Sequence, residues 1–149
     1  MSIVVPGAVA VLPEAGRRLE HLGVTHKLTE EQTGGAFYVC EAVFGPEGGS
    51  PLHIHHHEDE IIHVMEGVID IRLDREKLHV PAGGIIHLPK RIPHALQNPW
   101  KTPLRIMVHA IPGGLEHYFN DVDTALTEGS FTAEIHAQIS KKYGLEWLE

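Results

Sequence analysis

Short apolar runs separated by glycine and proline dominate the middle of the chain. Apolar, β-prone residues fill 36–44, and the turn-forming sequence GPEGGSP follows them. Similar runs occupy 60–64, 68–73, 85–88 and 104–111, and the sequence PGG closes the last one. Strands that recur about every 8–12 residues, with Gly and Pro between them, are typical of an all-β sandwich or barrel. The pattern therefore predicts an all-β fold.

The C-terminal region has a different periodicity. Phe131, Ile135 and Ile139 recur at spacing four, which places them on one face of a helix. Ser130 precedes them and is a good N-cap residue. We predict one short helix over about residues 131–143, packed on the barrel, and we expect no catalytic role for this tail.

The length of 149 residues indicates one domain over 1–149, with a barrel over about 20–115 and a helical tail over about 116–149. Twelve basic against 20 acidic residues give a net charge of −8, which argues against electrostatic binding to nucleic acid or anionic lipid. No run reaches the ~18 apolar residues of a membrane span, and the first residues lack the basic leader of a secretory signal. We expect a cytoplasmic protein. Cys40 cannot form an internal disulfide and is expected to be a small core residue.

Histidine is the unusual feature of the composition, with 13 residues against 12 Lys and Arg together. His53 and His55 are two residues apart, so on a strand they point to the same side. Residues 56–59 can form a turn, after which Glu60 begins the next strand and can face the same interior. The segment thus presents two nitrogens and one oxygen to one point.

A fourth ligand comes from the segment GGIIHLPKRIPHALQN, in which Pro89 and Pro93 fix the approach to His94. Three imidazoles and one carboxylate leave one or two positions open on a metal that prefers five or six ligands. Open positions accept water, O2 or a substrate oxygen. We predict one divalent transition metal ion per chain, and this donor set suits Fe, Mn, Ni, Co, Cu and Zn alike.

The first of these segments resembles the first motif of the cupin superfamily. The core of that motif is His-x-His, three or four residues, Glu, six residues and Gly. Here it is read as His53, His55, Glu60 and Gly67. The leading Gly of the motif is replaced by Glu47, which concerns a turn and not a ligand.

The second segment resembles the second cupin motif, which is Gly, five residues, Pro-x-Gly, two residues, His, three residues and Asn. The matching residues are Gly83, Pro89, His94 and Asn98. Arg91 stands at the Gly of Pro-x-Gly, again in a turn. All four ligand positions of the two motifs are therefore matched.

Over roughly residues 20–148 the chain is similar to single-domain cupins of the quercetin 2,3-dioxygenase type. The resemblance implies a double-stranded β-helix, or jelly-roll, barrel with a metal inside it, and a homodimer. It also implies a metal-dependent dioxygenase that acts with O2 on a flavonol-like or other enolisable aromatic small molecule. In that group Glu60 would be a ligand and also the base that takes the proton of the substrate hydroxyl.

Two other classes stay open at this point. One is a non-redox isomerase, cyclase or lyase that uses the metal as a Lewis acid, and the other is a non-catalytic cupin that binds a small molecule. The fold hosts many chemistries, so the sequence does not separate them. Four apolar residues are candidates for the wall of the pocket: Ile62, Val64, Leu96 and Ile106.

The other histidines of the region are not among the four predicted ligands. His56 and His57 are expected at the turn, although His57 shares the strand parity of the second ligand and could substitute for one. His63 should point away from the metal, and His87 is expected in the core with a backbone partner. His109 lies in the last strand and is expected to be part of the barrel wall. An acid–base role near the site is the alternative.

Overall fold

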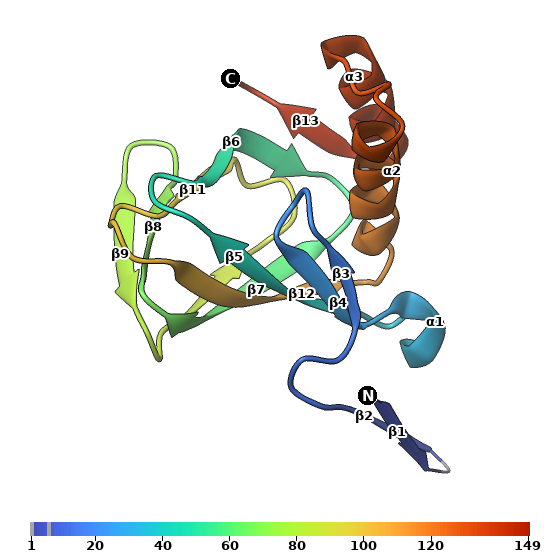
Figure 1. Ribbon diagram of the computed structural model, residues 1–149. Coiled ribbons are helices and arrows are strands. Elements are labelled where there is room, and N and C mark those ends of the chain that lie inside the picture. Colours follow the sequence, from blue (N-terminus) through green and yellow to red (C-terminus); the bar gives the residue numbers. More distant parts are fainter. Residues whose placement is uncertain (1, 6) are drawn as a thin grey trace.

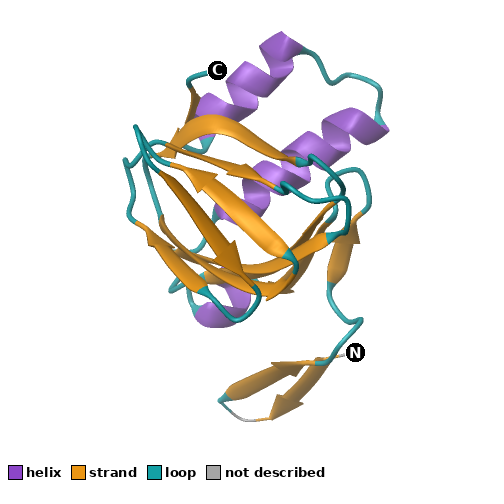
Figure 2. Cartoon of the chain, turned by 90° about the vertical axis from the view of Figure 1, so that its left-hand side faces the viewer, coloured by secondary structure: helices purple, strands orange, loops and turns teal. Residues whose placement is uncertain are grey.

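The computed structural model describes residues 2–5 and 7–149. Two antiparallel sheets face each other and form a barrel (Figures 1 and 2). The larger sheet has the strand order β10 (Ile85–Leu88), β7 (Asp59–Glu66), β12 (Leu104–Ile111), β5 (Tyr38–Phe44), β4 (Val24–Leu28), β3 (Arg17–Leu19). The smaller sheet has the order β13 (Leu145–Trp147), β6 (Gly49–His55), β11 (His94–Gln97), β8 (Val68–Arg72), β9 (Lys77–Pro81).

The other elements lie outside the two sheets. A separate hairpin of β1 (Ser2–Val5) and β2 (Ala8–Val11) projects from the barrel (Figure 2). The helices are α1 (Glu30–Thr33), α2 (Leu115–Thr127) and α3 (Ala133–Lys142). Within the described residues, no helix has the length and apolar character needed to cross a membrane.

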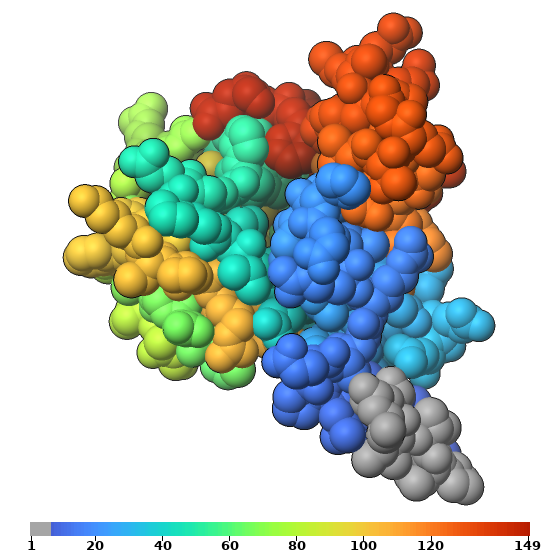
Figure 3. All heavy atoms as spheres, in the orientation of Figure 1, coloured from blue at the N-terminus to red at the C-terminus, as the bar shows by residue number. Residues whose placement is uncertain are grey.

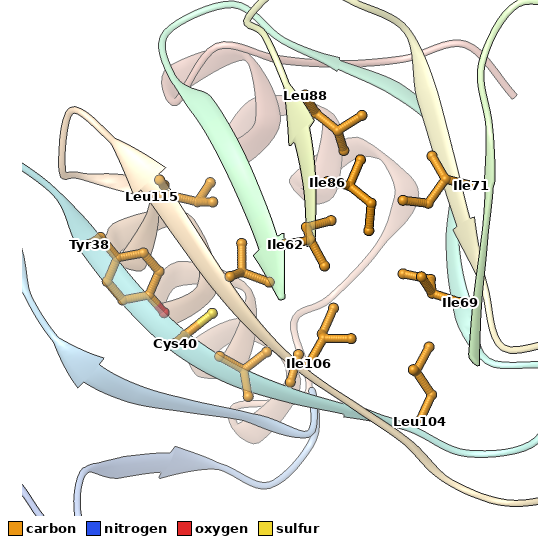
Figure 4. Close-up of a cluster of buried hydrophobic side chains, with 14 of the residues drawn as sticks. Tyr38, Cys40, Ile62, Ile69, Ile71, Ile86, Leu88, Leu104, Ile106 and Leu115 are labelled. Carbon is orange, nitrogen blue, oxygen red and sulfur yellow. The ribbon is translucent and has the colours of Figure 1, made fainter. Parts of the chain in front are cut away.

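Alternation of buried and exposed side chains builds the core. Along β12 every second residue from Leu104 to Ala110 is buried, and the residues between them are only partly covered. Figure 4 shows Ile69 and Ile71 of the smaller sheet facing Ile62 of the larger one. Complete burial of an Ile or Leu side chain contributes about 1.5–3 kcal/mol. In strands such as β12 and β7, the period of two therefore fixes which face turns inward.

The five strands predicted from apolar runs are present as β5, β7, β8, β10 and β12. The sequence GPEGGSP, expected as a turn, is in part strand, because β6 already begins at Gly49. The barrel strands β3, β4, β9, β11 and β13 were not predicted, because each is short and lacks a continuous apolar run. Their pairing partners decide their conformation.

The predicted helix over 131–143 is α3, which begins one residue after Thr132. The Thr132 hydroxyl accepts a hydrogen bond from the Ile135 N–H at 3.1 Å, so Thr132, and not Ser130, is the N-cap. A second helix, α2, was missed. Its sequence LEHYFNDVDTALT is rich in residues of low helix propensity. Packing stabilises it, because Leu115, Tyr118 and other side chains along it are buried.

Candidate metal centre

Two paired strands of the smaller sheet and one strand of the larger sheet position the four predicted ligands. His53 and His55 are inward-facing residues of β6, Glu60 faces inward from the start of β7, and His94 is the first residue of β11. The antiparallel register of β6 and β11 places His94 directly opposite His53. One ligand atom of each of the four residues lies within 4.8 Å of the others, and all four residues are buried. The structure thus brings together the set that the sequence spacing selected.

The ligand atoms converge on one point. Nε2 of His53 lies 3.1 Å from Nε2 of His55. Oε1 of Glu60 lies 3.1 Å from Nε2 of His55 and 3.2 Å from Nε2 of His94. The three imidazoles therefore present the same type of nitrogen to the carboxylate.

Hydrogen bonds on the opposite side of two rings set this orientation. The Nδ1 atom of His53 lies 2.7 Å from the carbonyl oxygen of Pro51, and that of His94 lies 3.0 Å from the carbonyl oxygen of Ile92. A carbonyl oxygen only accepts, so each Nδ1 carries the proton and donates it. The Nε2 lone pairs are then free for a metal, as in metal-ligating histidines generally.

The third ring is oriented by a carboxylate that the sequence analysis did not select. Nδ1 of His55 lies 2.8 Å from Oε1 of Glu58, which is buried beside it. A carboxylate partner makes an imidazole more basic and fixes its tautomer. Nothing in the run HHHEDE distinguishes Glu58 from its acidic neighbours, because its inward direction depends on the fold of the turn.

The cluster has polar atoms that lack partners. Among the described residues, Oε1 of Glu60 and Nε2 of His94 are buried side-chain atoms without a hydrogen bond. They lie close to each other, but their geometry is not that of a hydrogen bond. An unsatisfied buried polar group costs about 1–3 kcal/mol, and a cation at the common point would satisfy both atoms. Three nitrogens and one oxygen suit a divalent first-row ion, so the residues fit such a group.

Electrostatics within the cluster shift three pKa values. Burial raises the pKa of Glu60, but His55 and His94 outweigh it, and the pKa is about 2. Burial, with added repulsion from His55 and His94, lowers the pKa of His53 to about 4. Burial also lowers the pKa of His55, but Glu60 and Glu58 outweigh it and raise that pKa overall. The opposite shifts of His55 and Glu60 therefore share one cause, the attraction between the imidazole and the carboxylate.

A cavity of about 230 Å³ adjoins the cluster, and His53, His55 and Glu60 form part of its wall. The remaining wall is mostly apolar or aromatic, with no Lys or Arg among the described residues that line it. Leu96 and Ile106 line it as predicted, whereas Ile62 and Val64 do not and are core residues of the barrel.

The C-terminal elements close one side of this cavity. Its wall includes four residues of α2 and two residues of β13: Leu115, Tyr118, Phe119, Val122, Leu145 and Trp147. The sequence predicted a tail packed on the barrel without a catalytic role. The structure adds that the tail folds back onto the strand that carries two ligands. Cys40 is a buried core residue as predicted and also borders the cavity, where burial raises the pKa of its thiol to about 12.

The other histidines lie away from the cluster. His56 and His57 are exposed at the turn, and His63 is outward-facing, as its parity predicts. His87 was expected in the core, but it is exposed because the neighbours on either side of it in β10 take the inward positions. His109 alternates with buried residues of β12 and is on the outer face, so its position gives no support to a role at the site.

Comparisons with known proteins agree with this architecture. Residues 40–110 match the model of the cupin domain family. An uncharacterized protein of Methanocaldococcus jannaschii is 32% identical over 74 residues, which are 50% of this chain and 59% of that protein. The chain thus spans about three fifths of the length of this relative.

Two solved structures show similar folds. A protein with a double-stranded β-helix domain from Klebsiella pneumoniae superposes with a TM-score of 0.55 at 19% identity, covering 70% of this chain and 84% of that one. The polyketide cyclase RemF from Streptomyces resistomycificus superposes with a TM-score of 0.53 at 25% identity, covering 60% and 65%. The chain has the cupin, or double-stranded β-helix, fold.

Proposed function

We propose that this chain of cupin fold is a metal-dependent enzyme that oxygenates a small enolisable molecule, with the ion held by His53, His55, Glu60 and His94. One observation carries the proposal. A buried cluster of three imidazoles and one carboxylate, with two unpartnered polar atoms, borders an apolar cavity. A site of this kind joins a reactive ion to a mostly apolar pocket.

When bound, a divalent ion would supply open coordination positions at which a substrate oxygen and O2 lie side by side. The side chains hold this geometry in advance, because each imidazole is fixed by a hydrogen bond at its Nδ1 atom. Glu60 stays ionised across the neutral range, since its pKa is about 2. Its carboxylate is therefore available as a ligand. Acceptance of a substrate proton would require a hydroxyl that a bound ion has made more acidic, because a carboxylate of low pKa is a weak base.

The cavity limits the class of substrate. Its volume of about 230 Å³ lies below the ~300–1,000 Å³ of pockets that hold drug-sized ligands. Among the described residues that line the cavity there is no Lys or Arg, so the proposed ion is the one positive charge offered to a substrate anion, and a second negative charge remote from the ion has no cationic side chain to meet it. We infer that the substrate has at most one ring, carries at most one negative charge and binds through an enolisable carbonyl or hydroxyl group. A three-ring flavonol would require the wall to move.

A cyclase is the second candidate, and one observation favours it. The polyketide cyclase RemF is 25% identical over the superposed part. Polyketides also carry enolisable carbonyl groups, so the same pocket chemistry would serve a reaction without O2. An isomerase or lyase of the same metal-dependent type and a cupin that only binds its ligand are further outcomes of the test below.

The test uses metal-free protein loaded in turn with Fe(II), Mn(II), Ni(II), Co(II) and Cu(II). Oxygen uptake is followed with simple 1,3-diketones and with quercetin, with the His94→Ala variant as the control. Uptake that depends on the metal and on His94 is the expected result, larger for the diketones. Absence of uptake with every metal contradicts the oxygenase proposal. Turnover under argon would favour a cyclase, isomerase or lyase, and saturable binding without turnover would indicate a binding protein.

We further propose that the chain forms a homodimer. Apolar side chains are exposed on the outer face of the larger sheet, among them Met65, Ile85 and Ile111. A second copy would remove them from water. Light scattering coupled to size exclusion tests this, and a monomer at micromolar concentration contradicts it. The cytoplasmic location and the absence of a nucleic-acid partner stay predictions from sequence.

A further inference from the structure

The last strand of the chain pairs with the strand that carries two of the proposed ligands. β13 is the edge strand of the smaller sheet, and its register places Leu145 opposite His55 and Trp147 opposite His53. Main-chain hydrogen bonds continue on both sides of this pairing. The His56 N–H donates to the Gly144 carbonyl at 2.8 Å, and the Leu148 N–H donates to the Leu52 carbonyl at 2.9 Å. Without this segment, β6 would itself be the edge of the sheet.

Trp147 packs against the His53 ring. Residues directly opposite each other in an antiparallel pair place their side chains on the same face, and here the two ring centroids are 4.8 Å apart with 34° between the planes. The indole Nε1–H donates to the Ser140 hydroxyl of α3 at 2.9 Å, which fixes the orientation of the indole. His53 is therefore held by the Pro51 carbonyl at one ring atom and by an aromatic side chain across its face.

The same segment forms part of the cavity wall beside the site. Leu145 and Trp147 line the cavity beside His53 and His55. In the space-filling view the C-terminal segment, in red, lies between the orange helices and the green strands of the barrel (Figure 3). Loss of this segment would expose the edge of β6 and one wall of the cavity.

We propose that the C-terminal segment, residues 144–149, retains the metal ion, with Trp147 as the positioning residue that keeps His53 directed at it. The proposal rests on the metal site of the proposed function. Partners that orient a metal ligand without binding the ion typically change metal affinity by about 10- to 100-fold. Trp147 acts in this way through its contact with His53, and the strand excludes the water that would replace a departing ligand.

The experiment measures metal release and needs no substrate. Co(II)-loaded protein is mixed with excess chelator, and release is followed together with the visible absorption of Co(II), which reports the geometry of its ligands. Trp147→Ala is expected to release Co(II) about 10- to 100-fold faster and to shift the absorption band. Trp147→Phe keeps an aromatic ring on His53 and should restore most of the retention and the wild-type band. Trp100→Phe, at an exposed position in a loop, is the matched control and should behave as wild type.

Fluorescence gives a second measurement that does not depend on the Ala variant folding. The chain has two tryptophans, so Trp100→Phe leaves Trp147 as the only one. Stoichiometric Cu(II) or Co(II) should quench most of its emission, because its ring contacts a ligand ring. In Trp147→Phe the remaining emission, from Trp100, should change little.

The outcomes separate this inference from the proposed function. Wild-type protein that binds no Co(II) in equilibrium dialysis would overturn both. Wild-type protein that binds Co(II), with a Trp147→Ala variant of unchanged release rate and absorption, would overturn the inference alone. Unquenched Trp147 emission at full metal occupancy would also overturn it.

Discussion

His55 and Glu58 form a buried pair in which Nδ1 and Oε1 lie 2.8 Å apart and each side chain is only 6% exposed. The pair connects a proposed metal ligand to a carboxylate that does not itself belong to the cluster of ligand atoms. Such a carboxylate holds the ring in place and increases the electron density that the ligand offers to the ion. The contact thus assigns a role to a residue of the turn between β6 and β7.

Replacement of Glu58 by Gln should weaken metal binding. The amide cannot supply the charge of the carboxylate, and the expected loss of affinity is about 10- to 100-fold. Competition with a chromophoric chelator measures it. Glu30→Gln is the matched control, because the Glu30 carboxylate contacts His117 at 2.5 Å, both side chains are partly exposed and neither belongs to the metal cluster. Equal affinities of the two variants would show that Glu58 has no such role.

Replacement of His94 by Ala should remove most of the bound metal. The variant lacks one of the four ligand atoms. Oε1 of Glu60, which already has no hydrogen-bond partner, also loses the imidazole beside it. Elemental analysis of protein purified in parallel is expected to show at least about a tenfold fall in metal content. His109→Ala, on the outer face, should retain the wild-type content. Full metal content in the His94 variant would contradict the four-ligand site.

Replacement of Glu60 by Gln separates the two proposed roles of this residue. The amide oxygen can still ligate an ion but cannot accept the substrate proton. If Glu60 is the base, turnover should fall about 10²- to 10⁴-fold at equal metal loading. Activity per bound metal ion is the quantity to compare. Unchanged turnover at unchanged metal content would restrict Glu60 to ligation.

Metal affinity should rise with pH, and His55 should set the dependence. Its pKa is raised above the ordinary value of 6.5, so near neutral pH an incoming ion has to displace its proton. The pKa of His53 is about 4 and that of Glu60 about 2, so these two ligands hold no proton there. Below the pKa of His55, affinity should therefore fall about tenfold per pH unit, and more steeply below pH ~4. Titrations between pH 5 and 8 measure this slope, and a pH-independent affinity across that range would contradict it.

Tyr38 should contribute to stability through its hydroxyl. The hydroxyl lies 2.6 Å from Nδ1 of His26, inside the protein, and His26 Nε2 contacts Asn120 at 2.8 Å. Tyr38→Phe leaves the Nδ1 atom without a partner and should lower the free energy of unfolding by about 1–3 kcal/mol. Urea denaturation measures the loss.

Tyr143→Phe is the matched comparison for this variant. Its hydroxyl donates to Asp121 at 2.7 Å in a more exposed setting, where water can replace the lost bond. The expected loss is below about 1 kcal/mol. Equal losses in the two variants would mean that burial of the Tyr38 contact does not matter.

The spacing of residues by itself determined five apolar strands of the barrel and three of the four clustered side chains. A period of two places His53 and His55 on one face of β6 without any knowledge of the neighbours of that strand. The motif resemblance added His94, whose position opposite His53 follows from strand pairing between segments 41 residues apart. Local periodicity therefore accounts for most of the predicted cluster of side chains.

Tertiary structure alone decided what surrounds the cluster. The inward direction of Glu58 depends on the path of a turn, and α2 is a helix because it packs on the barrel in spite of its weak propensity. The pairing of β13 with β6 joins residues about 90 positions apart and brings Trp147 to His53. These contacts depend on the free energy of packing between distant segments, which has no periodic signal in the sequence.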